Sequence, residues 1–280
     1  MTIQQINQQF NEQLSPLYDQ EEIQAIFRFY IEIKLNVIDS ILYTDQQMEY
    51  DLPDFEKDLI DLKNGKPVQQ VVGKAFFYDY FFYVNEHTLI PRPETEELIY
   101  MITEKYERNA ALNIIDLGTG TGCIPITLAK LFPNATIKAL DISSEALEVA
   151  KRNNLELGTN VEFIQQDLLQ PFTLDKSFDI IISNPPYIRE LEKQEMHQNV
   201  LHYEPHLALF VSNDDPLIFY RKVAEFGINH LNPQGKIFCE INQYLGQETK
   251  EMFKKYFQEV YIHNDISGNN RIAEVFQAIC

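Results

Sequence analysis

A glycine-rich turn stands between a short apolar strand and a helix in the middle of this chain. The predicted strand is 113–117, the turn is Gly118-Thr119-Gly120-Thr121-Gly122, and the helix covers 124–131. Glycines permit a tight turn and let the backbone approach a ligand closely. Further strands are predicted at 136–141, 161–165, 178–183, 236–241, 260–263 and 272–276, with helices at 144–157, 217–231 and 247–257. This alternation predicts an α/β fold with a mostly parallel, doubly wound sheet.

The first 75 residues follow a different pattern, with apolar residues at helical spacing and no recognisable catalytic group. Ile3, Ile6 and Phe10 recur at the spacing of an amphipathic helix. Ser15-Pro16 is typical of an N-cap followed by proline in the first turn, so we expect a second helix to begin there. Aromatic residues crowd positions 75–84 and favour extended structure. The predicted organisation is a helical bundle at 1–74, a β-hairpin linker at 75–88 and an α/β domain at 89–280.

The charge of the chain narrows the range of partners. The 280 residues carry a formal net charge of −19. Gripping a phosphate backbone relies on basic residues and counterion release, so this charge disfavours direct nucleic-acid binding and favours a basic protein partner. The three cysteines form no CxxC pair or disulfide framework, which suits a reducing compartment. No apolar run approaches the ~20 residues that a membrane helix needs, so we expect a cytoplasmic protein without membrane contact, and a monomer.

Acidic residues stand at the ends of three predicted strands, near the glycine-rich turn. Asp116 precedes the turn, where a carboxylate suits a cationic amino group, such as the methionine end of S-adenosylmethionine, better than a pyrophosphate. Asp141 ends the next strand and can accept hydrogen bonds from both ribose hydroxyls. Asp167 follows the third strand and could receive the adenine amino group. One acid after a strand is often only an N-cap, but three in order indicate an S-adenosylmethionine site.

The tetrapeptide Asn184-Pro185-Pro186-Tyr187 directly follows the apolar strand predicted at 178–183. A planar NH2 group is a poor nucleophile until both N–H bonds are held and its lone pair is aimed. The side-chain oxygen of Asn184 can accept one N–H, and the Pro185 carbonyl can accept the other because the prolines remove competing backbone donors. Tyr187 would offer an aromatic face. A rigid turn is the plain alternative, but beside a cofactor loop the tetrapeptide predicts methyl transfer to an amide or exocyclic amine nitrogen.

Catalysis at such a site is expected to consist mostly of positioning. Orientation in a near-attack geometry can supply several kcal/mol, up to about 7–11 kcal/mol in model systems. The cationic sulfonium is already a strong electrophile, so we expect no metal, no covalent intermediate and no catalytic triad.

At this point the chain resembles the PrmC/HemK family, which methylates the side-chain amide of the glutamine in the Gly-Gly-Gln motif of class I peptide-chain release factors. The resemblance covers nearly the whole chain. The glycine-rich turn and the Asn-Pro-Pro-Tyr tetrapeptide are shared with other amino-group methyltransferases. More specific segments are 89–98 with its Pro-Arg-Pro-Glu-Thr core, Pro67-Val68-Gln69 with Gly73, Tyr203-Glu204-Pro205 and 267–271. The resemblance implies a Rossmann-like, seven-stranded class I methyltransferase domain preceded by a small helical domain that recognises the substrate.

The resemblance also implies which residues form the site. Cofactor contacts are expected at Gly118, Thr119, Gly120, Thr121, Gly122, Asp141, Asp167, Leu168 and Asn184. The glutamine is expected at Asn184, Pro185, Pro186 and Tyr187, of which Asn184, Pro185 and Tyr187 are the expected catalytic group. Many relatives carry an aromatic residue where Leu168 stands, so this chain would make an apolar contact with adenine there instead of a stack. The expected cofactor is S-adenosylmethionine, which leaves as S-adenosylhomocysteine.

Three other functions fit parts of the pattern. A DNA adenine methyltransferase would act on a similar amino group, but the net charge and the lack of a base-reading insertion argue against it. A glutamine methyltransferase of a ribosomal protein would share the tetrapeptide but usually differs around residues 93–95. A catalytically silent binding module would keep the fold, yet the intact loop, acids and tetrapeptide argue against such decay.

Two further features allow more than one interpretation. The acids of residues 94–97 stand at a predicted helix start, where the helix dipole favours them and they need no other role. Alternatively, the stiff segment 91–96 covers the cofactor and shapes the glutamine channel. Glu240, at the end of a predicted strand, is interpreted as structural.

Overall fold

The computed structural model describes residues 1–37 and 48–279. Cys280 and the part of the expected helical bundle at 38–47 lie outside the described residues. The chain divides into two compact units, Met1–Ala75 with His197–Tyr203, and Phe76–Met196 with Glu204–Cys280. The first unit therefore includes His197–Tyr203, a segment that the predicted organisation places in the α/β domain. The expected borders at 74 and 88 stay predictions. Among the described residues, no helix has the length and apolar character needed to cross a membrane.

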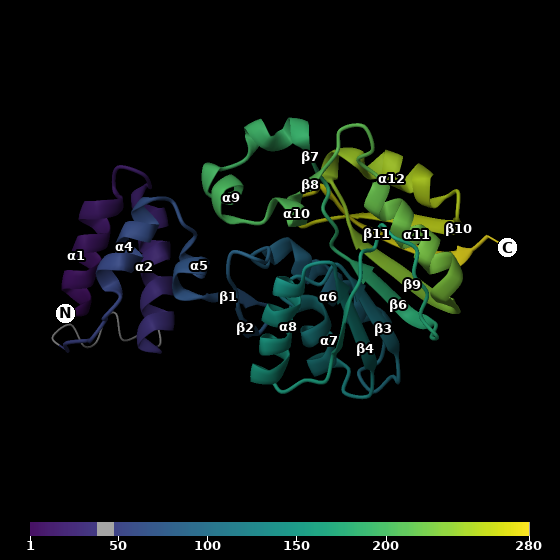
Figure 1. Ribbon diagram of the computed structural model, residues 1–280, viewed down its shortest axis with the longest axis horizontal. Helices are drawn as coiled ribbons and strands as arrows, with labels where there is room; N and C mark the ends of the chain where they lie inside the picture. The colour runs from purple at the N-terminus through teal and green to yellow at the C-terminus, as the bar shows by residue number, and fades with distance from the viewer. Residues whose placement is uncertain (38–47, 280) are drawn as a thin grey trace. The chain divides into compact units, whose positions relative to one another are not determined.

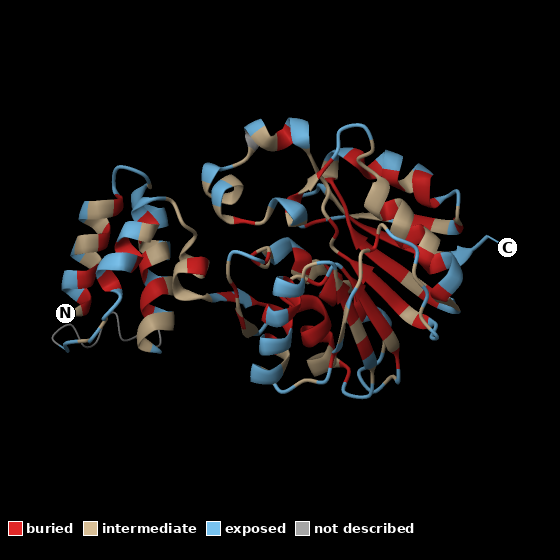
Figure 2. Ribbon diagram, in the orientation of Figure 1, coloured by how far each residue is buried: buried red, intermediate tan, exposed pale blue. Residues whose placement is uncertain are grey.

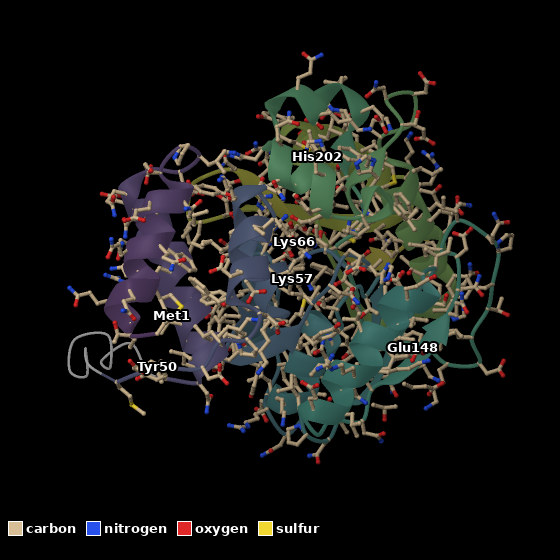
Figure 3. All side chains as sticks on the ribbon, turned by 60° about the vertical axis from the view of Figure 1, so that its left-hand side comes forward. Met1, Tyr50, Lys57, Lys66, Glu148 and His202 are labelled. Carbon is tan, nitrogen blue, oxygen red and sulfur yellow. The ribbon has the colours of Figure 1, made fainter. Side chains whose placement is uncertain are left out.

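The first unit is helical. Its helices are α1 (Ile3–Leu14), α2 (Gln20–Leu35), α4 (Phe55–Lys63), α5 (Val68–Val72) and α9 (Gln198–Tyr203). Phe10 of α1 is fully buried against the rings of Phe27, Tyr30 and Phe55, so the helical spacing of the sequence produces one apolar core. The amino group of Met1 donates to the Tyr50 carbonyl at 2.8 Å, at the end of the unit that Figure 3 labels.

The start of α2 differs from the expectation. Ser15 ends α1 as its C-cap, and Asp19 is the N-cap of α2, where its side chain accepts from Glu22 N at 2.9 Å. The prediction of a helix start at Ser15-Pro16 is therefore wrong. The physical reason is that Asp is as good an N-cap as Ser, and the Asp19 side chain is the one that accepts from the first turn of α2.

The second unit is built on a seven-stranded sheet (Figure 1). In spatial order its strands are β10 (Phe257–Asn264), β11 (Asn270–Ala278), β9 (Leu231–Glu240), β6 (Phe178–Ser183), β3 (Asn113–Leu117), β4 (Thr136–Asp141) and β5 (Glu162–Gln165). β11 is antiparallel to both neighbours, and the strands from β9 to β5 are parallel. The expected Rossmann-like α/β fold is confirmed. The predicted helix 247–257 is shorter, because α12 (Gly246–Phe253) ends where the approach to β10 begins.

Two apolar layers cover the sheet. Ile114 of β3 faces a cluster that includes α6 (Glu96–Lys105) and α7 (Cys123–Leu131). Its neighbour Ile115 faces the opposite cluster, with α11 (Ile218–His230) and α12. Successive strand residues point to opposite faces, so a strand that is buried on both sides reads as one apolar run. Figure 2 shows these central strands as the buried interior of the unit. α8 (Ser144–Glu156) packs beside β4 and β5.

A short hairpin precedes the sheet. β1 (Lys74–Phe77) pairs with β2 (Tyr80–Tyr83), and Tyr78 turns the chain with a left-handed φ of 58°. Phe77 and Phe82 are fully buried in the cluster that contains α7. Asn153 of α8 fixes β2 in both directions, since its Oδ1 accepts from Tyr83 N at 2.7 Å and its Nδ2 donates to Tyr83 O at 3.0 Å. From Phe76 onward, the hairpin is thus part of the second unit.

Candidate active site

A cavity of about 280 Å³ opens where the carboxyl ends of the parallel strands meet. The chain order reverses between β3 and β6, and such a switch point is where open α/β sheets bind their ligands. Of the twelve site residues that the family resemblance implies, ten line it, namely Gly118, Thr119, Gly120, Thr121, Asp141, Asp167, Leu168, Asn184, Pro185 and Pro186. Gly122 and Tyr187 do not line it.

The glycine-rich turn needs its glycines for two different reasons. Gly118 and Gly120 adopt left-handed φ values of 84° and 54°, although a Cβ at either would meet nothing within 4 Å. Gly122 has a φ of 78°, and a Cβ there would also lie 2.9 Å from Ile126 and 3.1 Å from Ala150. Gly122 therefore lets α7 begin close against α8, while the earlier glycines shape the backbone that faces the ligand.

Asp141 is held in place by the backbone that surrounds the cavity. Its Oδ2 accepts from Gly120 N at 2.8 Å and its Oδ1 accepts from Ser143 N at 3.0 Å. Burial raises the pKa of the Asp141 carboxyl, and these backbone donors oppose that rise. Each carboxylate oxygen has a second lone pair, so both can still accept a hydroxyl. A pair of neighbouring ribose hydroxyls matches that arrangement.

Asp116 does not stand beside the cavity as expected. It is fully buried under the turn and is absent from the cavity lining. Neither of its carboxylate oxygens has a hydrogen-bond partner among the described residues. Burial raises the pKa of Asp116 to about 7, and the Thr119 hydroxyl, which is near enough to oppose this rise, forms no hydrogen bond with the carboxylate. Asp116 is therefore set back from the cavity surface, and its contact with a cationic ligand group stays a prediction.

The third strand end supplies a mixed polar and apolar edge. Asp167 lines the cavity while its Oδ1 accepts from Leu169 N at 2.8 Å. Leu168, 9% exposed, presents an apolar side chain in the same lining. Ile142, after β4, is 44% exposed and also lines the cavity. A flat heteroaromatic group would find apolar contacts here and one carboxylate for an amino group.

The acceptor side of the cavity is organised by a buried chain of hydrogen bonds. Asn184 Nδ2 donates to Thr95 Oγ1 at 3.1 Å, and Thr95 Oγ1 donates to Glu240 Oε2 at 2.7 Å. Tyr187 OH donates to the other oxygen, Glu240 Oε1, at 2.8 Å. Burial raises the pKa of Glu240, while Thr95, Tyr187 and Arg271 lower it. Glu240 is thus more than a strand-end residue, and the interpretation of it as merely structural misses its contact with the tetrapeptide.

The acceptor atoms expected to bind an NH2 group remain available. Asn184 Oδ1 and the Pro185 carbonyl make no hydrogen bond within the described residues. Tyr187 turns its hydroxyl toward Glu240, and its ring packs against the apolar cluster beside α11. An aromatic face of Tyr187 toward a planar substrate group therefore stays a prediction.

The segment 89–95 forms one wall of the cavity. Pro91, Arg92 and Thr95 line it. Glu204, buried, accepts from Ile90 N at 3.0 Å and pairs with the Arg92 guanidinium. Of the two interpretations of this segment, its position favours the one in which it shapes the ligand site.

Sequence reasoning missed the residues that precede this wall. Glu86, His87 and Thr88 line the cavity after the hairpin. Thr88 is 1% exposed, and its hydroxyl has no partner among the described residues. Such a hydroxyl is a ready donor and acceptor for a polar ligand. The only available signal was proximity in sequence to the specific segment at 89–98.

The fold and this site define a methyltransferase domain. Residues 95–207 match the family described as Methyltransferase small domain. A solved structure with the same fold is the T. thermophilus 16S rRNA N2 G1207 methyltransferase (RsmC) in complex with AdoMet and guanosine. It superposes with a TM-score of 0.51 at 16% identity, over 73% of this chain and 49% of that one.

More similar sequences narrow the class. The release factor glutamine methyltransferase of Flavobacterium psychrophilum is 44% identical over 98% of this chain and 99% of its own length. The protein of the same description from Bacteroides thetaiotaomicron is 41% identical over 92% of this chain and 94% of its own. The chain belongs to the release factor glutamine methyltransferase family.

Proposed function

We propose that this protein transfers a methyl group from S-adenosylmethionine to the side-chain amide nitrogen of the glutamine in the Gly-Gly-Gln motif of class I release factors. One observation carries the proposal. The glycine-rich turn and the acceptor atoms of Asn184 and Pro185 line a single cavity. Membership of the release factor glutamine methyltransferase family supports the choice of amide substrate.

The cavity suits the cofactor in several ways. Asp141 has two lone pairs for ribose hydroxyls, and the Leu168 edge suits adenine. The buried hydroxyls of Thr88 and Thr119 have no partner among the described residues and suit the polar methionine end. The cofactor supplies an electrophilic methyl group bound to sulfur. The protein's part is to hold its ribose and adenine from one side of the cavity while the amide enters from the other.

The tetrapeptide would aim the amide. Asn184 Oδ1 accepts one N–H and the Pro185 carbonyl accepts the other, which turns the nitrogen lone pair toward the methyl carbon. When bound, S-adenosylmethionine would supply an electrophilic methyl group and would leave as S-adenosylhomocysteine with the C–S electron pair, while the methylated nitrogen would release one proton to water. Holding both N–H bonds favours this because the positive charge that develops on nitrogen is shared with two acceptors. Positioning is thus the main source of catalysis.

The test is mass spectrometry of unmethylated release factor after incubation with this protein and S-adenosylmethionine. A gain of one methyl group on the glutamine of the Gly-Gly-Gln loop, lost with Asn184→Ala, is the expected result. Methylation of a ribosomal protein or of adenine in DNA under the same conditions would redirect the proposal to those substrates. A chain that binds release factor without any transfer would be a binding module.

The acidic charge fits the proposed partner. A release factor works on RNA and is expected to present basic surface, which a chain of net charge −19 attracts. We therefore infer that the complex weakens as salt increases, and binding that is indifferent to salt would contradict this. The proposal also places the protein in the cytoplasm as a monomer without direct nucleic-acid binding, with the helical unit contributing to recognition of the factor. Light scattering in solution tests the monomer.

A further inference from the structure

The orientation of the Asn184 amide decides whether the site can accept an amide substrate. The Oδ1 atom must face the cavity, since an NH2 group in its place would meet the N–H bonds of the glutamine donor to donor. Nothing in the tetrapeptide itself sets this choice. The side chain of Asn184 has two ends of nearly the same shape, so a specific partner must select one of them.

The partner is Thr95, and Thr95 is in turn constrained by Glu240. The hydroxyls of Thr95 and Tyr187 and the charge of Arg271 favour the ionised form of Glu240 against the effect of burial, and in that form the carboxylate accepts hydrogen bonds and cannot donate one. Because Glu240 Oε2 lies 2.7 Å from Thr95 Oγ1, the single hydroxyl hydrogen of Thr95 must point to Glu240. Thr95 Oγ1 can then only accept from its other neighbour, so Asn184 presents Nδ2 to it, at 3.1 Å. The remaining end of the amide, Oδ1, is then left for the cavity that Asn184 lines.

Burial protects these hydrogen bonds from water. Glu240 is 1% exposed and Thr95 is 2% exposed, so bulk water cannot easily replace either partner. The second oxygen of Glu240 accepts from Tyr187 OH, which fixes the carboxylate plane and ties the tetrapeptide to it at both ends. Thr95 opens α6, Asn184 follows β6 and Glu240 ends β9, so three separate elements meet at this point.

We propose that Glu240 and Thr95 are positioning residues that fix Asn184 with its carbonyl oxygen toward the substrate. This inference rests on the proposed function, because it assigns the acceptor amide of that reaction. The inference goes beyond the proposed function because it attributes the orientation of the Asn184 amide to Glu240, which does not line the cavity. The chemistry needed from Glu240 is acceptance at both oxygens, and an amide side chain cannot provide that.

Matched variants of Thr95 give the direct test. Thr95→Val keeps the shape but removes the hydroxyl, and we expect kcat to fall about tenfold with little change in the KM for S-adenosylmethionine. Thr95→Ser restores the hydroxyl and should recover most of that loss. Thr103→Val is the control, since Thr103 lies on the same helix and donates only to Tyr100 O. Wild-type kcat in Thr95→Val would overturn the proposal.

Glu240 is tested through Thr95. Glu240→Gln can accept from only one of the two hydroxyls, so kcat should fall about tenfold in the wild-type background. If Glu240 acts through Thr95, the same substitution should lower kcat less in Thr95→Val. Full additivity of the two effects would contradict the proposal that Glu240 acts through Thr95. Thermal unfolding of each variant shows whether a fall in kcat is caused only by loss of folded protein.

A measurement without substrate separates this inference from the proposed function. In 15N-labelled protein the side-chain NH2 signals of Asn184 can be assigned by their loss in Asn184→Asp. Thr95→Val should shift these signals and speed their exchange with water, whereas Thr95→Ser should preserve them. Unchanged signals in Thr95→Val overturn the inference even if the enzyme methylates release factor. If Thr95→Val alters the Asn184 signals but the wild-type protein does not methylate release factor, the orientation of Asn184 is supported and only the proposed substrate is refuted.

Discussion

The cavity has a cofactor half at the glycine-rich turn and an acceptor half at the tetrapeptide. Each half has one buried carboxylate near it, and the two carboxylates differ in their hydrogen-bond partners. Asp116 lies under the cofactor turn with no hydrogen-bond partner for either oxygen among the described residues. Glu240 lies behind the acceptor tetrapeptide and accepts one hydroxyl at each oxygen. A buried charge without donors is costly, whereas one with two donors can hold its neighbours in a defined orientation. The comparison suggests that Asp116 limits stability and that Glu240 sets geometry.

The largest expected effect concerns Asp116 and pH. Its pKa rises on folding from the ordinary 3.8 to about 7. Between those values the unfolded chain releases the proton while the folded chain keeps it, so the free energy of unfolding falls as pH rises. For one group this amounts to at most about 4 kcal/mol, complete above pH 7.

Asp116→Asn removes this titration. Urea unfolding of both proteins at pH 4, 5.5, 7 and 8 should show the variant gaining on the wild type with each step, with little further gain beyond pH 7. A difference between the two proteins that stays constant across this range would mean that Asp116 is ionised in the folded state. Asp116 would then resemble Glu240, and the comparison between the two carboxylates would break down.

The next effect concerns the residue that Glu240 orients. Asn184→Ala removes one of the two acceptors for the substrate N–H bonds, and we expect kcat to fall by about a hundredfold or more. The affinity for S-adenosylhomocysteine, which depends mainly on the other half of the cavity, should change much less. Single-turnover kinetics and calorimetry measure the two quantities. Equal losses in both would show that the halves do not work separately.

The two halves also differ in how far sequence could predict them. The cofactor half is local, because Gly118 to Gly122 and Asp141 follow their strands directly and their order along the chain reveals the strand ends. The acceptor half depends on partners far apart in sequence, since Thr95 meets Glu240 across 145 positions. No spacing rule connects such residues, so the position of Glu240 at a strand end indicates no more than a structural role. The same limit hid the burial of Asp116, which depends on how the turn folds over it.

A smaller effect is expected at Asp141, the carboxylate of the cofactor half that, unlike Asp116, lines the cavity. Asp141→Asn leaves one carbonyl oxygen where two backbone N–H groups and two ligand hydroxyls need acceptors. The affinity for S-adenosylhomocysteine should fall about tenfold by calorimetry. With saturating cofactor, kcat should return close to the wild-type value, unlike in Asn184→Ala. A persistent loss of kcat would mean that Asp141 also influences the acceptor half.

The smallest effects test whether the cofactor turn is shaped by contacts or by backbone conformation alone. Gly118→Ala places a methyl group in open space and carries only the strain of a left-handed φ, so we expect a loss of about 1 kcal/mol in the free energy of unfolding. Gly122→Ala carries the same strain and also meets Ile126 and Ala150, so its loss should be larger, about 2–3 kcal/mol. Urea unfolding of the two variants measures the difference. Equal losses would mean that α7 and α8 can move apart at no cost, and that the turn is held by its φ angles rather than by the packing beneath it.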